Sequence, residues 1–197
     1  MMQHITLQLT SSHHHGSAFW DYLRLRKRFF VDELHWPIPH NADVEMDEYD
    51  NPETWYSLAM LNGRCVGGAR VIPTTTEWGK VSYMVRDAFH GAMPGIPRAA
   101  MPGDRVSPAV WECSRLVIAE DLDRDAKARA LDEIVAGLIE VSTAHGATEL
   151  MTLSSLAVLR ALRGLGFDVQ RLGERYRDAD DGRLYAVMSM PVEAPAR

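Results

Sequence analysis

The sequence predicts an α/β protein of the α+β kind, a three-layer sandwich in which a mixed, mostly antiparallel sheet carries helices on both faces. The dipeptide Asn62-Gly63 joins two strand-like segments and is the strongest short signal for an antiparallel hairpin. Residues 123–145 have the apolar period of a long amphipathic helix. Strand patterns precede and follow this helix, so the sheet is expected to combine antiparallel and parallel neighbours.

The first half of the chain supplies one strand, one helix and the hairpin. Residues 4–9 alternate between apolar and polar side chains, as a strand does, and a polar loop follows. Residues 18–34 have apolar positions at helical spacing and end before Trp36-Pro37. Residues 54–61 and 64–73 are the two hairpin strands, and Gly67-Gly68 inside the second predicts a bulge or a closely approaching backbone.

The second half predicts a further alternation of strands and helices. Residues 83–89 form a short helix, and the Pro- and Gly-rich residues 91–108 form a surface loop. Residues 110–118 are a central strand, because their apolar run is broken only by Glu112, Ser114 and Arg115. After the long helix, which Gly146 ends, come a strand, a helix and two strands at residues 148–153, 156–165, 167–172 and 183–191.

Composition bounds the function. A chain of 197 residues is expected to form one domain, over residues 1–197, and its net charge of −6 argues against a nucleic-acid partner. It has no run of about 18 apolar residues and no signal peptide, so no membrane association and a cytoplasmic location are expected. Cys65 and Cys113 are isolated, and the adjacent residues His13 to His15 do not share a face, so no metal site is predicted.

Residues 26–50 are unusually dense in charged and aromatic side chains. Arg26 lies on the predicted helix, Phe30 one turn later shares its face, and Trp36 follows. Pro37 and Pro39 end the helix, and a carboxylate cluster follows them. Cationic, aromatic and anionic groups in one short stretch indicate a site for a small polar ligand.

Five motifs together resemble the acyl-homoserine lactone synthases, the autoinducer synthases of bacterial quorum sensing. In order they are Arg26-x-x-x-Phe30 with Trp36, Glu45-x-Asp47-x-x-Asp50, Gly67-Gly68-x-Arg70, Pro73-Thr74-Thr75, and Trp111-Glu112-Cys113-Ser114-Arg115. The resemblance covers residues 18–118 well and the rest of the chain through the order of elements. It implies the GNAT-like acyltransferase fold, in which the strands before and after the long helix splay into a V that holds a pantetheine arm.

The resemblance also implies the reaction. An acyl group passes from a thioester, carried by acyl carrier protein or coenzyme A, to the α-amine of S-adenosylmethionine, and a lactone closes with loss of methylthioadenosine. Both compounds are substrates, so no cofactor is expected. The residues expected to bind S-adenosylmethionine are Arg26, Phe30, Trp36, Asp47, Asp50 and Arg70.

The catalytic residues implied are Glu112, Glu45 and Arg115. A protonated α-amine cannot attack a thioester, so a base is required, and Glu112 is favoured over Glu45 because the thioester should lie along its strand. Glu112 and Arg115, three apart, point to opposite faces of a regular strand, so a bulge or bend near Cys113-Ser114 is predicted if both act.

Two further sets of residues follow from the resemblance. Leu116, Met151, Thr152 and Leu153 are expected along the acyl chain, although Thr152 is also an ordinary strand residue. Lys127, Arg129, Arg160 and Arg163 are a candidate docking patch for an acidic carrier protein, with surface solvation as the alternative.

Three alternatives remain open from the sequence. Taken singly, the charged residues could be solvated helix and turn residues, Trp36 a core residue, and Glu112 with Arg115 a buried ion pair. An acetyl-CoA-dependent GNAT acetyltransferase is a rival, but residues 124–130 lack the glycines of its pyrophosphate-binding turn. A non-catalytic module that binds S-adenosylmethionine or acyl chains is the third.

Overall fold

The structure is a computed structural model and describes residues 1–193. The chain divides into two compact units: unit 1 holds Met1–Val71 and Arg115–Val141, and unit 2 holds Ile72–Ser114 and the residues from Ser142 onward. Each unit therefore combines two separate stretches of sequence. The single domain expected over residues 1–197, whose last four residues lie outside the described part, stays a prediction.

Unit 1 contains a hairpin sheet, the first helices and most of the long helix. Its elements are β1 (Met2–Gln8), η1 (Leu9–His15), α1 (Ala18–Arg26), η2 (Lys27–Glu33), β2 (Trp55–Leu61), β3 (Arg64–Pro73), the end of β4 (Val110–Ile118) and α3 (Arg124–Ala144). The last residues of β3 and of α3 belong to unit 2. The helix predicted over residues 18–34 is α-helical only to Arg26, because η2 continues it as a wider π-helix. The polar loop predicted after β1 is a 3₁₀ helix, η1.

The hairpin forms as predicted. Asn62 and Gly63 have φ angles of 51° and 82°, the two positive values that a tight hairpin turn requires. β1 pairs with β2 and β2 with β3, both antiparallel, and β4 lies next to β3. A register shift between Ala59 and Met60 leaves Val66 as the extra residue of a bulge in β3.

Gly67 and Gly68 face opposite sides of this sheet, and each leaves room for a helix. A Cβ atom at Gly67 would lie 3.2 Å from Ile134 of α3, and also 2.7 Å from the Val117 carbonyl oxygen. A Cβ atom at Gly68 would lie 2.9 Å from the Tyr22 ring of α1. The predicted close approach is confirmed, and unit 1 has helices on both faces of its sheet.

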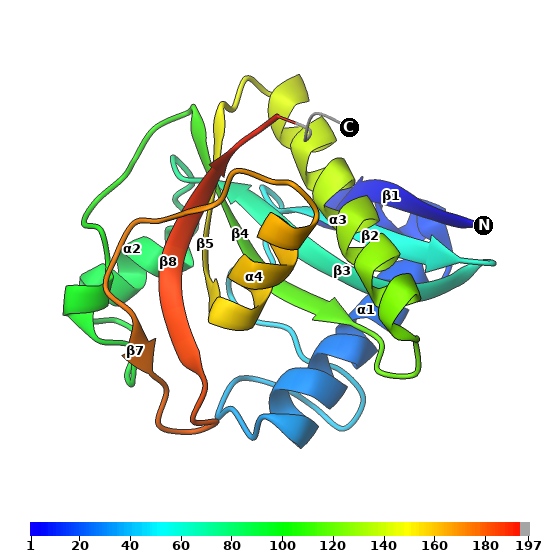
Figure 1. Ribbon diagram of the computed structural model, residues 1–197, viewed down its shortest axis with the longest axis horizontal. Coiled ribbons are helices and arrows are strands. Elements are labelled where there is room, and N and C mark those ends of the chain that lie inside the picture. Colours follow the sequence, from blue (N-terminus) through cyan, green and yellow to red (C-terminus); the bar gives the residue numbers. More distant parts are fainter. Residues whose placement is uncertain (194–197) are drawn as a thin grey trace. The chain divides into compact units, whose positions relative to one another are not determined.

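Unit 2 contains the other strands. Its elements are α2 (Met84–Phe89), η3 (Arg98–Ala100), the start of β4, β5 (Glu149–Ser155), α4 (Leu156–Gly164), β6 (Gln170–Arg171), β7 (Tyr176–Arg177) and β8 (Leu184–Pro191). β5 is parallel to β4 and antiparallel to β8, and the two short strands β6 and β7 both pair with β8. Figure 1 shows β5 and β8 side by side with α4 against them.

The pairing of β4 with β5 is short. It runs from Val110 opposite Glu149 to Cys113 opposite Thr152, whereas β5 continues beside β8 to Ser155. Parallel pairing therefore ends at Cys113 and Thr152, within the strand pair for which the V-shaped splay is expected.

Other predictions for unit 2 are confirmed in part. The helix predicted over residues 156–165 is α4, which Ser155 caps by accepting a hydrogen bond from the Val158 amide. The strand predicted over residues 167–172 is wrong for most of its length, because only Gln170–Arg171 pair as β6, and β7 was not predicted. Within residues 1–193, none of the helices is both long and apolar enough to cross a membrane. The cytoplasmic location stays a prediction.

Candidate active site

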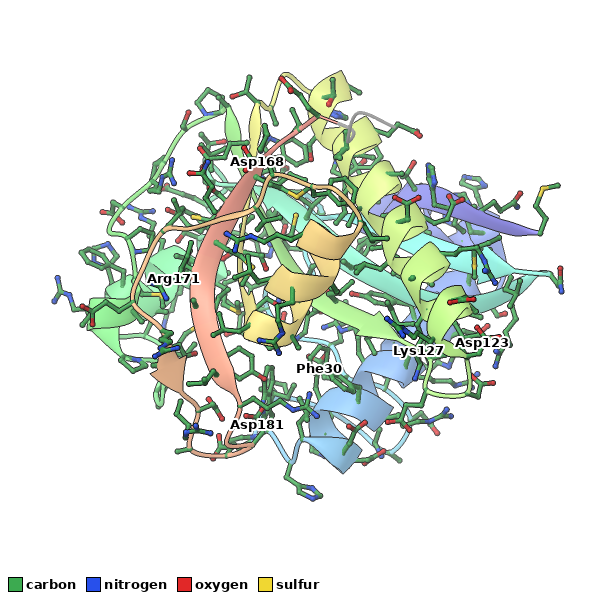
Figure 2. All side chains as sticks on the ribbon, in the orientation of Figure 1. Phe30, Asp123, Lys127, Asp168, Arg171 and Asp181 are labelled. Carbon is green, nitrogen blue, oxygen red and sulfur yellow. The ribbon has the colours of Figure 1, made fainter. Side chains whose placement is uncertain are left out.

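Arg26 reaches the interior of unit 1 from the last turn of α1. Tyr22 lies one turn earlier on the same face, and the Arg26 side chain is 0% exposed. The π-helix η2 then brings Phe30 into the core (Figure 2), and the chain leaves the helix at His35, whose φ is +58°. The Glu45 amide donates to the carbonyl oxygen of Leu23 at 3.3 Å, which holds the acidic segment against α1.

Arg26 binds two of the three predicted carboxylates. Its Nε donates to Glu45 Oε2 at 2.6 Å, and its two terminal nitrogens donate to the two Asp50 oxygens at 2.7 and 2.8 Å. The second contact is a bidentate pair, the strongest and most directional form of this interaction. Tyr56 adds a hydrogen bond from its hydroxyl to Asp50 Oδ1 at 2.9 Å.

Two more arginines complete the network. Arg70, on β3, makes a bidentate pair with Asp47 and lies 3.1 Å from Asp50 Oδ2. Arg115, on β4, donates from Nη2 to Asp47 Oδ2 at 2.6 Å and from Nε to Glu45 Oε1 at 3.3 Å. The structure thus brings together the six charged residues Arg26, Glu45, Asp47, Asp50, Arg70 and Arg115, which the sequence had placed in separate motifs.

The network is buried and balanced, with three guanidinium groups and three carboxylates. Burial raises the pKa of Asp50, but the charges of Arg70 and Arg26 outweigh it and hold that pKa well below its usual range. The pKa of Asp47 is lowered in the same way by Arg70 and Arg115. Both carboxylates are therefore anionic at neutral pH.

Arg115 departs from strand geometry. Its φ is +55°, in the left-handed region, which costs roughly 1–2 kcal/mol for a residue with a Cβ atom. The predicted bend therefore occurs one residue after Cys113-Ser114. It interrupts the alternation of side chains along β4 and directs Arg115 to Glu45 and Asp47.

Aromatic rings border the charged network. Phe30 and Trp36 stack with centroids 5.1 Å apart and planes at 25°. The Arg115 guanidinium lies 5.4 Å from the Phe30 ring centroid, and that of Arg70 lies at the same distance from Tyr49. Tyr49 and Tyr56 were not predicted as site residues. Tyr56 lies opposite Arg70 in the hairpin, and this register depends on the bulge in β3. The sequence alone could identify Tyr56 only by its place in a strand that pairs with the strand of Arg70.

Glu112 lies in unit 2 and has different partners. Its side chain is buried, and its two oxygens accept hydrogen bonds from the Met84 and Val85 amides, each at 2.7 Å. These two amides open α2, so Glu112 fixes the start of that helix. Its role as a base stays a prediction.

The four residues expected along the acyl chain are not one group in the structure. Met151 and Leu153 belong to the apolar core of unit 2, with Tyr83, Val85 and Val187. Thr152 lies between them and so points to the opposite face of β5. Leu116 lies in unit 1 and is half-buried. An acyl-binding role for these residues stays a prediction.

The charged network in unit 1 can exchange partners with a suitable ligand. A ligand with a carboxylate could take a guanidinium, and a ligand with an ammonium could take a carboxylate released by that exchange. A sulfonium could replace a guanidinium above an aromatic ring. A small ligand that carries groups of both signs is therefore the best match.

Comparisons with known proteins point to one family. A family model described as autoinducer synthase matches residues 11–195. The acyl-homoserine-lactone synthase of Acinetobacter nosocomialis is 32% identical over 157 residues, 75% of this chain and 79% of that protein. The isovaleryl-homoserine lactone synthase of Bradyrhizobium diazoefficiens is 30% identical over 169 residues, 85% of this chain and 70% of that protein.

Solved structures agree in fold. BjaI, a CoA-dependent acyl-homoserine lactone synthase solved with MTA, superposes with a TM-score of 0.78 at 25% identity, covering 98% of this chain and 84% of its own. The synthase LasI superposes with a TM-score of 0.73 over 99% of this chain and 91% of its own. At 19% identity LasI supports the fold alone.

Proposed function

Because the chain belongs to the autoinducer synthase family, we propose that it is an acyl-homoserine-lactone synthase. It acylates the α-amine of S-adenosylmethionine from a pantetheine thioester, closes the product to an N-acyl homoserine lactone and releases methylthioadenosine. The observation that carries this proposal is the network of three arginines and three carboxylates in unit 1. S-adenosylmethionine carries a sulfonium, an ammonium and a carboxylate, so it presents both signs of charge to such a network.

The network supports specific roles in binding. The substrate carboxylate pairs with Arg26 or Arg70, each of which already makes a bidentate carboxylate contact. Asp47, Asp50 and Glu45 meet the positive groups. Phe30 and Trp36 offer aromatic faces to the sulfonium and the adenine.

The chemistry requires one base and two leaving groups. The base takes one proton from the ammonium, and the neutral amine nitrogen then attacks the thioester carbonyl carbon. The carbon–sulfur bond breaks, and the nitrogen's second proton passes to the departing thiolate, which leaves as the thiol. The substrate carboxylate oxygen then attacks the carbon beside the sulfonium, and methylthioadenosine leaves with the electrons of the second carbon–sulfur bond. The protein mainly orients this second step, because nucleophile and leaving group are already in place.

Two carboxylates are candidates for the base. Glu112 is buried on β4, the strand along which the thioester is expected, and its carboxylate is held there by hydrogen bonds from the Met84 and Val85 amides. Glu45 is already held by two guanidinium groups, those of Arg26 and Arg115, and so belongs to the binding network of unit 1. We propose Glu112 as the base, and no cofactor.

The carrier of the acyl group is the finer part of the proposal. Arg160 is exposed on α4, but Arg163 donates twice to the Val169 carbonyl oxygen, at 2.9 and 2.7 Å, and so braces a loop. Lys127 and Arg129 lie on α3 in unit 1. We propose a pantetheine thioester as the donor, on either acyl carrier protein or coenzyme A. Comparison of kcat/KM for one acyl chain on the two carriers identifies which of them is used, and activity with neither contradicts the proposal.

Mass spectrometry of a defined reaction tests the function. Purified protein is incubated with S-adenosylmethionine and a series of acyl thioesters, and we expect an acyl-homoserine lactone with an equal amount of methylthioadenosine. Binding of S-adenosylmethionine without either product would identify a silent binding module. Transfer of acetyl groups from acetyl-CoA to other amines would identify a GNAT acetyltransferase.

A further inference from the structure

Tyr22 connects three parts of unit 1 around the charged network. It is 0% exposed, and its hydroxyl donates to the backbone carbonyl oxygen of Arg115 at 2.9 Å. Its ring lies 5.4 Å below the Arg26 guanidinium. Gly68 of β3 leaves space for the ring edge, since a Cβ atom there would come within 2.9 Å of it.

The hydrogen bond from Tyr22 is accepted by a residue with an unfavourable backbone conformation. Arg115 has a φ of +55°, an unfavourable conformation for a residue other than glycine. Such a conformation persists only when surrounding contacts hold it. The Tyr22 hydroxyl donates to the carbonyl oxygen of Arg115 itself, on the C-terminal side of that residue.

The orientation of the Arg115 side chain depends on that backbone. In this conformation its guanidinium reaches Asp47 at 2.6 Å and lies over Phe30 at 5.4 Å. In a regular strand conformation the side chain would project from a different angle and would not keep both contacts. A contact that holds the Arg115 backbone in this conformation therefore also holds the Arg115 side chain in the charged network.

We propose that Tyr22 is a positioning residue for S-adenosylmethionine binding: its hydroxyl holds the Arg115 backbone so that the Arg115 side chain completes the charged network. This inference rests on the proposed function, and it concerns a residue outside the motifs that carry the family resemblance. Tyr22 acts through Arg115 and needs no contact with the substrate.

The variant Tyr22→Phe removes the hydroxyl and keeps the ring against Gly68 and Arg26. We expect it to bind S-adenosylmethionine about tenfold more weakly in calorimetry, the scale of one lost hydrogen bond that leaves a buried carbonyl unsatisfied. The KM for the acyl thioester should stay nearly unchanged. Tyr185→Phe is the matched control, because it removes a hydroxyl that donates to Asp181 in unit 2, and its binding should equal that of the wild type.

A double-mutant cycle separates positioning from a merely structural role. In an Arg115→Ala background, Tyr22→Phe should weaken binding no further, since the side chain that it positions is gone. Tyr22→Phe with lower thermal stability and wild-type affinity would overturn the inference, as would an equal loss in both backgrounds. If the wild-type protein binds S-adenosylmethionine normally, either of these results overturns this inference alone. A wild-type protein that does not bind S-adenosylmethionine overturns the proposed function as well.

Discussion

Each oxygen of the Glu112 carboxylate accepts a hydrogen bond from a backbone amide, that of Met84 or that of Val85, at 2.7 Å. We expect Glu112→Gln to reduce acyl transfer about 100-fold, the usual scale for a lost acid–base group. Binding of S-adenosylmethionine should stay nearly unchanged, because Glu112 lies outside the unit 1 network. Single-turnover kinetics and calorimetry measure the two effects.

A structural effect of the same substitution has its own readout. Glutamine has one acceptor oxygen, and its nitrogen would face an amide donor at the start of α2. A fall in melting temperature with an unchanged rate for the folded protein would make Glu112 a structural residue. Equal loss of binding and rate would place it in the substrate-binding site.

Asp50 is the most highly connected carboxylate of the network, bound to Arg26, Arg70 and Tyr56. Asp50→Asn should lower the free energy of unfolding by about 3–5 kcal/mol, because it leaves a buried guanidinium short of its partner. The pKa of Asp50 is lowered in the folded protein, so its stabilising effect is present above its ordinary pKa and lost as the pH falls toward the folded value. Denaturation below about pH 4 should therefore depend less on pH in the variant.

An exposed aspartate gives the control for this prediction. Asp168 lies on the loop before β6 (Figure 2). Asp168→Asn should change stability by no more than about 0.5 kcal/mol. If Asp50→Asn behaves like Asp168→Asn, the network contributes little to stability, and its role is limited to binding.

At this scale the sequence was informative about charged residues and less so about tyrosines. Arg26, Glu45, Asp47 and Asp50 could be predicted because they stand at the spacing of the autoinducer synthase motifs, whereas each charge alone is as expected of a solvated residue. Tyr22 and Tyr56 look like ordinary core residues, because only the folded structure shows where a phenol hydroxyl points. Tyr22 is four residues before Arg26, and this shared helix face was the available signal.

At the scale of elements, a bulge decides the site. The Asn62-Gly63 turn sets Leu61 opposite Arg64 and Met60 opposite Cys65, which would place Tyr56 opposite Ala69. The extra residue in β3 shifts the register by one, so Tyr56 lies opposite Arg70 instead. A shift of one residue exchanges the two faces of a strand, so the bulge brings Arg70 to the Asp50 side. Gly67-Gly68 indicated an irregularity but not its position.

The helix α3 packs so closely on the sheet that one of its residues must be glycine. A Cβ atom at Gly137 would lie 2.3 Å from Ser57 Oγ and 2.9 Å from His4 Cδ2. Alanine is better than glycine in a helix by about 1 kcal/mol, but overpacking of a core costs about 1–3 kcal/mol. We expect Gly137→Ala to destabilise the protein in chemical denaturation.

Gly164, on α4, is the matched control, because nothing lies within 4 Å of a Cβ atom built there. Gly164→Ala should stabilise by about 0.5 kcal/mol. Stabilisation by both substitutions would show that α3 can move away from β2 without loss.

His4 makes the contact between β1 and α3 sensitive to pH. Its ring nitrogens lie 2.8 Å from Glu133 and 3.1 Å from Glu140. Burial lowers the pKa of His4, but the two glutamates outweigh it and raise that pKa above its ordinary value of 6.5. The protonated form is favoured in the folded state, so this stabilisation is complete below the ordinary pKa and is lost as the pH rises through the raised one.

We therefore expect the wild type to lose stability relative to His4→Gln between about pH 6 and pH 8. Because His4 is partly exposed, the difference should be below about 1 kcal/mol. Chemical denaturation of both proteins at the two pH values measures it. A constant difference across this range would mean that His4 contributes through packing alone.

At the scale of the whole molecule, the order of elements was predictable because long periodic segments such as α3 and the hairpin dominate it. The strands in the last third of the chain were less predictable. The strands β6 and β7 have two residues each, too few for any alternation to be recognised, and they form because β8 offers a long partner. The division into two units has no signal in the sequence, since each unit combines two separate stretches.

This division gives a prediction for ligand binding. All the residues proposed to bind S-adenosylmethionine lie in unit 1, whereas Glu112 lies in unit 2. A ligand at 100 times its Kd stabilises the native state by about 2.7 kcal/mol. In hydrogen–deuterium exchange, S-adenosylmethionine should slow the amides of Asp47 and Tyr49 most, because they bind the Asp50 and Asp47 side chains directly.

The amides of Met84 and Val85 serve as the internal reference, since they bind Glu112 in the other unit. They should slow less than Asp47 and Tyr49 when S-adenosylmethionine is added alone. The physical reason is that the ligand replaces partners within the charged network, and only segments that carry those partners gain or lose hydrogen bonds directly. Protection that begins at Met84 and Val85 and leaves Asp47 unchanged would move the S-adenosylmethionine site to unit 2 and reassign the network of unit 1 to a structural role.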